Sequence, residues 1–206
     1  MKSHPSNRRA FTLIELLIVM GLIVSVLLIV GPQLATSDSA GLRQAETMIA
    51  GLLRSARAVS VMNKTRGRLL ISQDLSVPEN RLALLAVVLR DESGAWTLVG
   101  EPVRLPEPVR IVPANAVPTP AGVAWPAKIV STFSGSETMS VDGLPTGNYS
   151  YLEFTVTGSI AVSKQLVFSL CDRSSPAPVF VALDQMRCFL LRTSGNFVLL
   201  REGSSL

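Results

Sequence analysis

A long apolar run close to the amino terminus is the feature that most constrains this chain. Residues 16–30 contain no charged side chain, and the apolar stretch 11–30 is about 20 residues long. A helix rises about 1.5 Å per residue, so this stretch can cross the roughly 30 Å hydrocarbon core of a bilayer. We therefore expect residues 11–32 to form one transmembrane helix, followed by a single medium-sized domain.

The residues before this run are basic, and no cleavage site follows it. Lys2, Arg8 and Arg9 stand in the leader 1–10 with no acidic side chain among them. The positive-inside rule then keeps the amino terminus in the cytoplasm and sends the chain from about residue 33 to the far side. A secretory signal is cut after its apolar region, where this sequence offers no small-residue site. We expect the apolar segment to be retained, with the lipid bilayer as its first partner.

Glu15 is an acidic residue inside this apolar segment. Such a side chain costs about 2.5–3.5 kcal/mol near the centre of a membrane helix unless it is paired or lies at an interface. No Lys or Arg occurs within 11–33, so a cation must come from outside the segment. Two interpretations remain open. Either Glu15 stays hydrated near the cytoplasmic interface, or cleavage after Ala10 frees an amino group on Phe11 that pairs with Glu15 of a neighbouring copy.

The run Ala10-Phe11-Thr12-Leu13-Ile14-Glu15, preceded by arginines, resembles the signal of type IV prepilins and type II secretion pseudopilins. The resemblance implies that prepilin peptidase cuts between Ala10 and Phe11 and methylates the amine of Phe11. It also implies that Glu15 serves filament assembly and that Pro32 bends the long helix. Ala10 stands where this family nearly always has Gly, a departure that bears on the efficiency of cleavage.

This resemblance implies a structural subunit of a type IV pilus-like filament or of a type II secretion pseudopilus. The subunit would span the bacterial inner membrane once, with its carboxyl-terminal domain in the periplasm. Its protein partners would be prepilin peptidase, other pilins or pseudopilins, and an inner-membrane assembly platform. The passages 52–63, 153–158 and 192–195 are loosely similar to H-type pseudopilins and related minor pilins. The alternatives are a DNA-binding or adhesive minor pilin and a membrane-anchored periplasmic enzyme.

Charge and histidine content restrict the chemistry of a cleaved chain. The formal net charge is +4, but removal of the leader leaves 16 basic and 15 acidic side chains. The only histidine is His4, in that leader, so the usual general base and a frequent zinc ligand are missing. We predict no catalytic site, no metal and no cofactor. Nucleic acid is not favoured as a partner, although one basic patch could bind it: Arg54, Arg57, Lys64, Arg66 and Arg68.

Beyond Pro32 the hydrophobic pattern predicts the second half of a long helix, over 33–63. Pro32 removes a backbone donor and should kink the helix. Apolar residues then recur at steps of three and four, which favours an amphipathic helix packed on a sheet; a coiled coil is the alternative. The apolar positions are Leu42, Ala45, Ile49, Leu52, Ala56 and Val59.

After Asn63, short β-branched runs between Gly, Pro and Ser predict an exported antiparallel β domain over 64–206. The segment 101–147 carries eight prolines, and we expect it to be a long surface excursion. The fold class is therefore α+β and pilin-like, with a long kinked amino-terminal helix packed on an antiparallel sheet. The predicted strands are 68–72, 82–90, 96–99, 109–112, 151–156, 166–170, 179–183, 188–192 and 197–200.

Two cysteines, Cys171 and Cys188, leave a second pair of alternatives open. In an oxidising compartment a disulfide could close a loop of roughly 17 residues, worth on the order of 3 kcal/mol. Two reduced thiols buried separately in strands would fit the sequence equally well. The spacing alone does not decide between them.

Overall fold

The computed structural model divides into two compact units, 1–37 and 38–206. Apart from Ser37, it describes four residues of the first unit, Leu17, Val19, Met20 and Leu22, which are helical and exposed. The predicted sites Ala10, Phe11, Glu15 and Pro32 lie outside the described residues. From Ser37 onward, the structure describes residues 37–74, 76–115, 117–122, 124–172, 178–180 and 185–201. Within this described part, no helix is both long enough and apolar enough to cross a membrane.

The helix of the second unit is α2, Ser37–Asn63, and it is amphipathic as predicted. Its fully buried positions recur at steps of three and four, as expected for one face of a helix. The predicted stripe contained Leu52 and Val59, which lie half-buried at its flank. A serine is tolerated in the stripe because the Ser60 hydroxyl donates to the carbonyl oxygen of Ala56 at 2.6 Å. The buried positions are Leu42, Ala45, Ile49, Leu53, Ala56 and Ser60.

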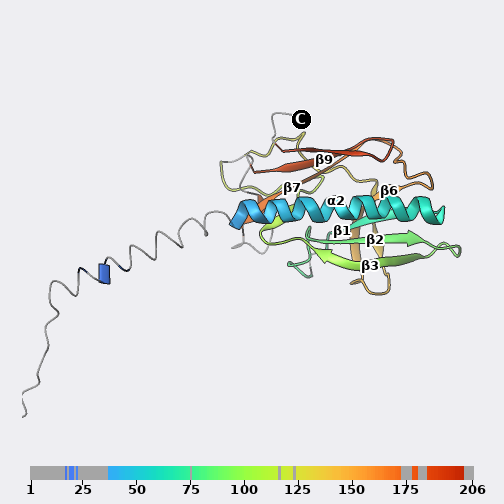
Figure 1. Cartoon of the computed structure of the whole chain (residues 1–206), viewed down its shortest axis with the longest axis horizontal. Helices are drawn as coiled ribbons and strands as arrows, with labels where there is room; N and C mark the ends of the chain where they lie inside the picture. Colours follow the sequence, from blue (N-terminus) through green and yellow to red (C-terminus); the bar gives the residue numbers. More distant parts are fainter. Residues whose placement is uncertain are drawn as a thin grey trace, which may run out of the picture. The chain divides into compact units, whose positions relative to one another are not determined.

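The strands of the second unit form two antiparallel sheets, of order β3-β2-β1-β6-β5 and β10-β9-β7-β4, and β8 pairs with the end of β7. Figure 1 shows α2 running between β1, β2 and β3 on one side and β7 and β9 on the other. The predicted α+β class is confirmed. The strands are β1 Gly67–Ser72, β2 Leu84–Arg90, β3 Trp96–Arg104, β4 Val109–Ile111, β5 Gly135–Met139, β6 Gly147–Phe154, β7 Lys164–Asp172, β8 Val179–Phe180, β9 Arg187–Leu191 and β10 Phe197–Leu200.

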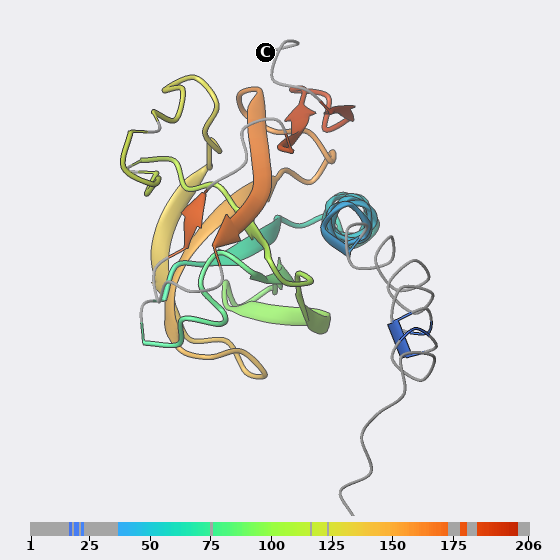
Figure 2. The same ribbon diagram turned by 90° about the vertical axis from the view of Figure 1, so that its left-hand side faces the viewer.

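One large apolar core joins α2 to both sheets. It contains the buried stripe of α2, the inward residues of β1, β2 and β6, and residues of β4, β7 and β9. Figure 2 shows the helix end-on beside these strands. Each fully buried Leu or Phe contributes about 1.5–3 kcal/mol. The helix therefore packs on the sheets of its own chain, as predicted, and not in a coiled coil along this stripe.

The first sheet also buries much of its outer face. Successive side chains of a strand point to opposite faces, so Leu69 and Ile71 of β1 enter the main core while Leu70 points outward. Leu70 belongs to a second, smaller cluster against which Trp96 of β3 packs. The members of this cluster are Leu70, Ala86, Val88, Met139, Val141 and Tyr149.

The strand predicted from Leu82 begins instead at Leu84. Leu82 has a φ of 58°, in the left-handed region, which an extended strand cannot contain. This conformation costs a branched residue about 1–2 kcal/mol. The side chain of Leu82 is only 1% exposed, so its burial offsets the strain.

The sequence patterns missed β5 and misplaced the limits of several strands, of which β3 and β6 differ most. β5 reads Gly-Ser-Glu-Thr-Met, and its three central side chains are exposed, so no apolar alternation marks it. Its pairing with β6 draws residues 147–150 into that strand, which ends at Phe154 and not at Val156. β3 continues past Val99, where the predicted strand ended, because a bulge opposite Leu85 and Val87 absorbs the irregularity.

The segment 101–147 is only partly the surface excursion that we expected. It supplies the end of β3, all of β4, which was predicted, and all of β5. Val109, Ile111, Val112 and Ile129 are buried in the main core. The prolines lie mostly between these short strands, so the segment belongs to the domain and contributes to its stability.

The two cysteines are not joined in a disulfide. Cys188 of β9 stands opposite Val167 of β7, whereas Cys171 lies four residues further along β7. Four strand residues span about 13 Å, beyond the roughly 7 Å between Cα atoms that a disulfide tolerates. The structure therefore has two separately buried thiols. Cys171 Sγ donates to the carbonyl oxygen of Pro108 at 3.1 Å, and burial raises the pKa of Cys188 to about 11.

Candidate assembly surface

The face of α2 that points away from the core is exposed along the helix. It combines basic, small and apolar side chains, and no acidic residue between 40 and 63 is exposed. A helix face of this kind needs no partner for the domain to fold, because the opposite stripe already fills the core. Its exposed residues are Ala40, Arg43, Gln44, Thr47, Gly51, Arg54, Ala58, Val61, Met62 and Asn63.

Gly51 stands in the middle of this exposed face. A Cβ placed there would meet nothing within 4 Å, and φ is not in the left-handed region, so no contact in the domain requires glycine. Glycine inside a helix costs about 1 kcal/mol relative to alanine. With Thr47 and Ala58 as its neighbours on the same face, Gly51 leaves the helix backbone open to close approach.

Arg54 is held in place beside this bare stretch of helix. Its guanidinium lies 5.5 Å from the ring centroid of Phe197, a cation–π contact between α2 and β10. A shallow groove of about 360 Å³ between α2 and the second sheet includes both residues in its lining. The head group of Arg54 therefore stays exposed while its position is fixed.

Two glycine turns lock the carboxyl-terminal end of α2. Gly158 and Gly195 have φ values of 72° and 76°. A Cβ on Gly195 would overlap the carbonyl oxygen of Gly158, and a Cβ on Gly158 would lie 2.7 Å from Cγ2 of Val61. Arg57 donates to Oδ1 of Asn196 from the helix side. The three passages with loose similarity to minor pilins therefore meet at this point in the fold.

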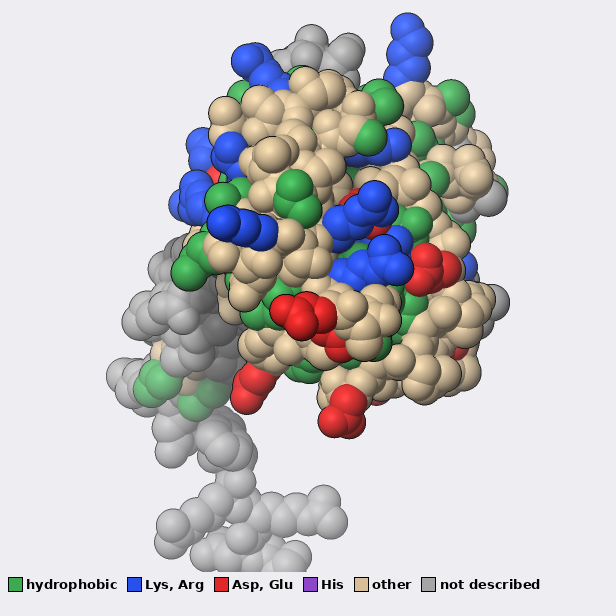
Figure 3. Space-filling view, turned by 90° about the vertical axis from the view of Figure 1, so that its right-hand side faces the viewer, with side chains coloured by type: hydrophobic (Ala, Val, Ile, Leu, Met, Phe, Trp, Pro, Cys, Tyr) green, Lys and Arg blue, Asp and Glu red, His purple; other side chains and the backbone are tan. Residues whose placement is uncertain are grey.

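Basic side chains gather on this helix and at its end. Figure 3 looks at the end where α2 finishes: Lys and Arg side chains lie over the upper part, and most Asp and Glu side chains lie lower. Lys64 follows the helix with a φ of 51°. We name five residues the basic helix surface; four are exposed, Arg57 is half-buried, and none forms an ion pair among the described residues. They are Arg43, Arg54, Arg57, Lys64 and Arg192.

Exposed carboxylates gather elsewhere, along β3 and the turns next to it. Asp142 belongs to this group because its neighbour Gly143 packs on β3, where a Cβ would lie 3.0 Å from Cδ2 of Leu98. A hydrogen bond from the Ser93 hydroxyl lowers the pKa of Asp91, which keeps that carboxylate charged. None of the group forms an ion pair in the described part of the chain. The acidic β3 surface comprises Asp91, Glu92, Glu101 and Asp142.

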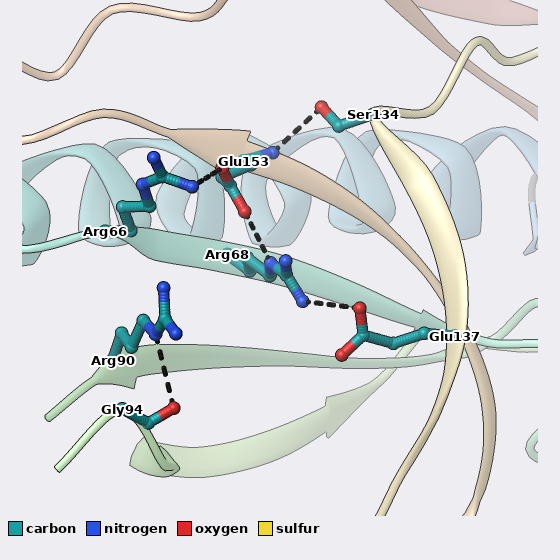
Figure 4. Close-up of polar contacts among 7 residues, drawn as sticks. All are labelled: Arg66, Arg68, Arg90, Gly94, Ser134, Glu137 and Glu153. Carbon is teal, nitrogen blue, oxygen red and sulfur yellow. Dashed lines mark hydrogen bonds and ion pairs between the residues drawn. The ribbon is translucent and has the colours of Figure 1, made fainter.

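The structure separates Arg68 from the basic patch to which the sequence assigned it. Arg68 is buried on the outer face of the first sheet, with Nε 2.7 Å from Oε2 of Glu153 and Nη1 3.1 Å from Oε2 of Glu137 (Figure 4). Its guanidinium lies 4.1 Å from the ring centroid of Trp96 and 3.8 Å from that of Tyr151. Two carboxylates and two aromatic rings satisfy this charge, so Arg68 joins four strands and does not bind nucleic acid from here.

The described part of the chain offers no assembled chemical site. It contains no histidine, and no three of its Cys, Asp or Glu side chains are close enough to hold a metal ion. An open cleft of about 670 Å³ beside β5 is lined by hydroxyls and amides. Its one carboxylate is Glu137, which already pairs with Arg68. The residues that line this cleft do not place a nucleophile next to a general base.

Comparison with known proteins returns one motif and one structure. Residues 5–31 match the family model of the prokaryotic N-terminal methylation motif, so the predicted prepilin-type signal is confirmed. The solved structure of the minor pseudopilin EpsH from the type 2 secretion system of Vibrio cholerae is similar at a TM-score of 0.42 and 13% sequence identity, over 77% of this chain and 94% of that chain. No curated protein matches the sequence.

Proposed function

We propose that this chain is a structural subunit of a type IV pilus-like filament or of a type II secretion pseudopilus, with no catalytic role. The methylation motif over residues 5–31 carries this proposal. Prepilin peptidase cuts between Ala10 and Phe11 and methylates the new amine of Phe11. Residues 11–32 then hold the subunit in the inner membrane, with the domain in the periplasm, until an assembly platform adds it to other pilins or pseudopilins.

Glu15 gives the filament its register. The carboxylate of Glu15 in one subunit pairs with the Phe11 amine of its neighbour. Within one chain, Glu15 lies four residues after Phe11. A subunit added one step out of place leaves both charges unpaired in a low-dielectric environment, which is strongly unfavourable. Release from lipid into the filament therefore replaces lipid contacts by helix packing and brings these two charges together.

The domain contributes a rigid helix with one free face. The core and the Arg57–Asn196 hydrogen bond hold α2 against the sheets. The exposed face between Arg43 and Met62 carries no exposed carboxylate and is bare at Gly51. This arrangement supports the proposal, because a filament subunit needs a surface that is exposed in one copy and covered in the assembly.

Mass spectrometry of the mature amino terminus tests this function. In a strain with active prepilin peptidase we expect the chain to begin at methylated Phe11, and without the peptidase we expect it to begin at Met1. Ala10→Gly serves as a matched variant and should be cleaved at least as completely. Recovery of the chain with Met1 attached, from cells whose peptidase processes other prepilins, would overturn the proposal.

A further inference from the structure

Two groups of exposed charges in the domain, the basic helix surface and the acidic β3 surface, are similar in extent. Arg43 and Arg57 lie 14 residues apart on α2, a separation of about 21 Å along the axis. On the acidic β3 surface, the turn at Asp91 leads into β3, whose residues 96–101 span about 17 Å. The members of the two surfaces form no ion pairs within the described part of the chain. Exposed Arg90 stands beside Asp91, with its Nε 3.2 Å from the carbonyl oxygen of Gly94, so the acidic β3 surface borders a basic side chain at this end.

We propose that the basic helix surface of one copy docks on the acidic β3 surface of the next copy, a contact that rests on the proposed filament function. After cleavage the chain would carry almost equal numbers of basic and acidic side chains. Repulsion between copies is therefore small overall, and the separated charges orient one copy against the next. The occupant of the exposed helix face is a second copy of this chain.

The two surfaces differ, so the contact is head-to-tail. A symmetric contact made through only one of these surfaces would place like charges together, either two basic helices or two acidic edges. A head-to-tail contact leaves each end of the pair free for a further copy and builds an open filament or a ring. This geometry agrees with a filament subunit.

Uncharged residues of α2 that lie between the members of the basic helix surface let the two copies approach closely. Gly51 and Ala58 offer no long side chain, and Val61 and Met62 are 45% and 79% exposed. Exposed ion pairs contribute little when they remain fully hydrated. Apolar side chains between the charges exclude water from the contact and make the pairs more effective.

Zero-length cross-linking of the full chain in isolated membranes tests the contact. A carbodiimide activates a carboxylate, and an amine in contact with it displaces the activated group to form an amide. The reagent leaves as a urea, which has taken up the elements of water. We expect Lys64 to be joined to Asp91, Glu92, Glu101 or Asp142 of another copy, as shown by peptides from mixed heavy and light isotope-labelled chains. Lys128→Ala, at an exposed lysine outside the surface, should leave the yield unchanged, whereas Lys64→Ala should abolish this cross-link.

Charge reversal with exchange provides the second arm. The variants Lys64→Glu/Arg192→Glu and Glu92→Lys/Glu101→Lys should each lose self-association at least about tenfold. Mixed together they should associate, because the reversed helix surface of one meets the reversed β3 surface of the other. Association that also falls about tenfold between 50 and 500 mM salt supports the same contact.

The outcomes separate this inference from the proposed function. Normal self-association of both reversed variants, or failure of the mixture to restore it, would overturn the contact while leaving a filament with methylated Phe11 intact. Cross-links of Lys64 outside the acidic β3 surface would also overturn it. So would salt-sensitive binding to duplex DNA or to phosphatidylglycerol vesicles that the Lys64→Glu/Arg192→Glu variant loses while self-association persists. An unprocessed amino terminus would instead contradict the proposed function.

Discussion

Arg57 of α2 donates from Nη1 to Oδ1 of Asn196 at 2.5 Å, which ties the helix to the turn between β9 and β10. Below this bond the Gly195 turn rests directly on the Gly158 turn. The helix is therefore held at its carboxyl-terminal end by two turns as well as by the core stripe. Because the helix is fixed to its domain in this way, a contact made on its exposed face would also hold the domain in position.

Gly195→Ala should destabilise the domain strongly. The alanine would need a left-handed φ, which costs about 1–2 kcal/mol, and its Cβ would displace the carbonyl of Gly158. We expect the free energy of unfolding to fall by at least about 2 kcal/mol, measured by denaturant titration of the full chain in detergent. Gly122→Ala is the matched control, because φ there is also positive but nothing lies within 4 Å. Equal losses in the two variants would contradict a packing role for Gly195.

The parts of the chain that were predictable from sequence are those encoded by neighbouring residues. The prepilin-type signal is a linear motif, and α2 follows from a period that the local sequence carries. The shift from Leu52 to Leu53 in the buried stripe arises because both are apolar and only the sheets decide which one points inward. β5 was missed because its exposed centre, around Glu137, carries no hydrophobic pattern.

The acidic β3 surface could not be predicted because tertiary contacts assemble it, whereas three residues of the basic helix surface, Arg54, Arg57 and Lys64, stood in the predicted basic patch. Asp142 is 41 residues from Glu101 in sequence, and the packing of the Gly143 turn on Leu98 brings it to β3. Conversely, Arg68 is two residues from Arg66 and both pair with Glu153, yet the burial of Arg68 removes it from the basic patch. The proximity of charges in the sequence therefore led to a basic patch that was too large, and it did not reveal the acidic β3 surface.

Arg68→Ala should be among the most destabilising single substitutions on the outer face of the first sheet. Removal of the guanidinium leaves Glu153 partly buried without its 2.7 Å partner, and it opens a gap between Trp96 and Tyr151. Breaking a buried pair costs about 3 kcal/mol or more. Glu137→Gln is the control: that carboxylate is 42% exposed, and its change should cost less than about 1 kcal/mol. Chemical denaturation of both variants compares the losses.

Burial of Cys188 predicts a loss of stability at alkaline pH. Because desolvation raises the pKa of this thiol to about 11 from 9.0, the folded state keeps a proton that the unfolded state has lost between these values. The free energy of unfolding should therefore fall as pH rises from 9 to 11, by at most about 2 kcal/mol. Cys188→Ala should be less stable at pH 7 but should show a smaller fall over this range. An identical slope in both proteins would rule out Cys188 as its source.

Gly51→Leu should impair assembly without impairing the fold. Leucine favours helix over glycine by roughly 0.8 kcal/mol, and no residue lies within 4 Å of the added Cβ, so thermal stability should rise slightly. The same side chain would block close approach to the exposed face, and incorporation into sheared filaments should drop several-fold. Gly51→Ala is the matched control, with similar stabilisation and near-normal incorporation. Normal incorporation of the leucine variant would show that this stretch of helix stays uncovered in the filament.

Glu15→Ala and Glu15→Leu separate processing from assembly. Neither change touches the bond between Ala10 and Phe11, and both make the segment more apolar, so cleavage and membrane insertion should persist. Incorporation should be abolished, because the amine of a neighbouring Phe11 would be buried without a carboxylate, at a cost of about 3–5 kcal/mol per contact. Sheared filament fractions compared with membrane fractions by immunoblot give the measurement. Glu15→Asp keeps the charge on a shorter side chain and should retain part of the incorporation, whereas a hydrated, non-pairing Glu15 would allow all three variants to assemble alike.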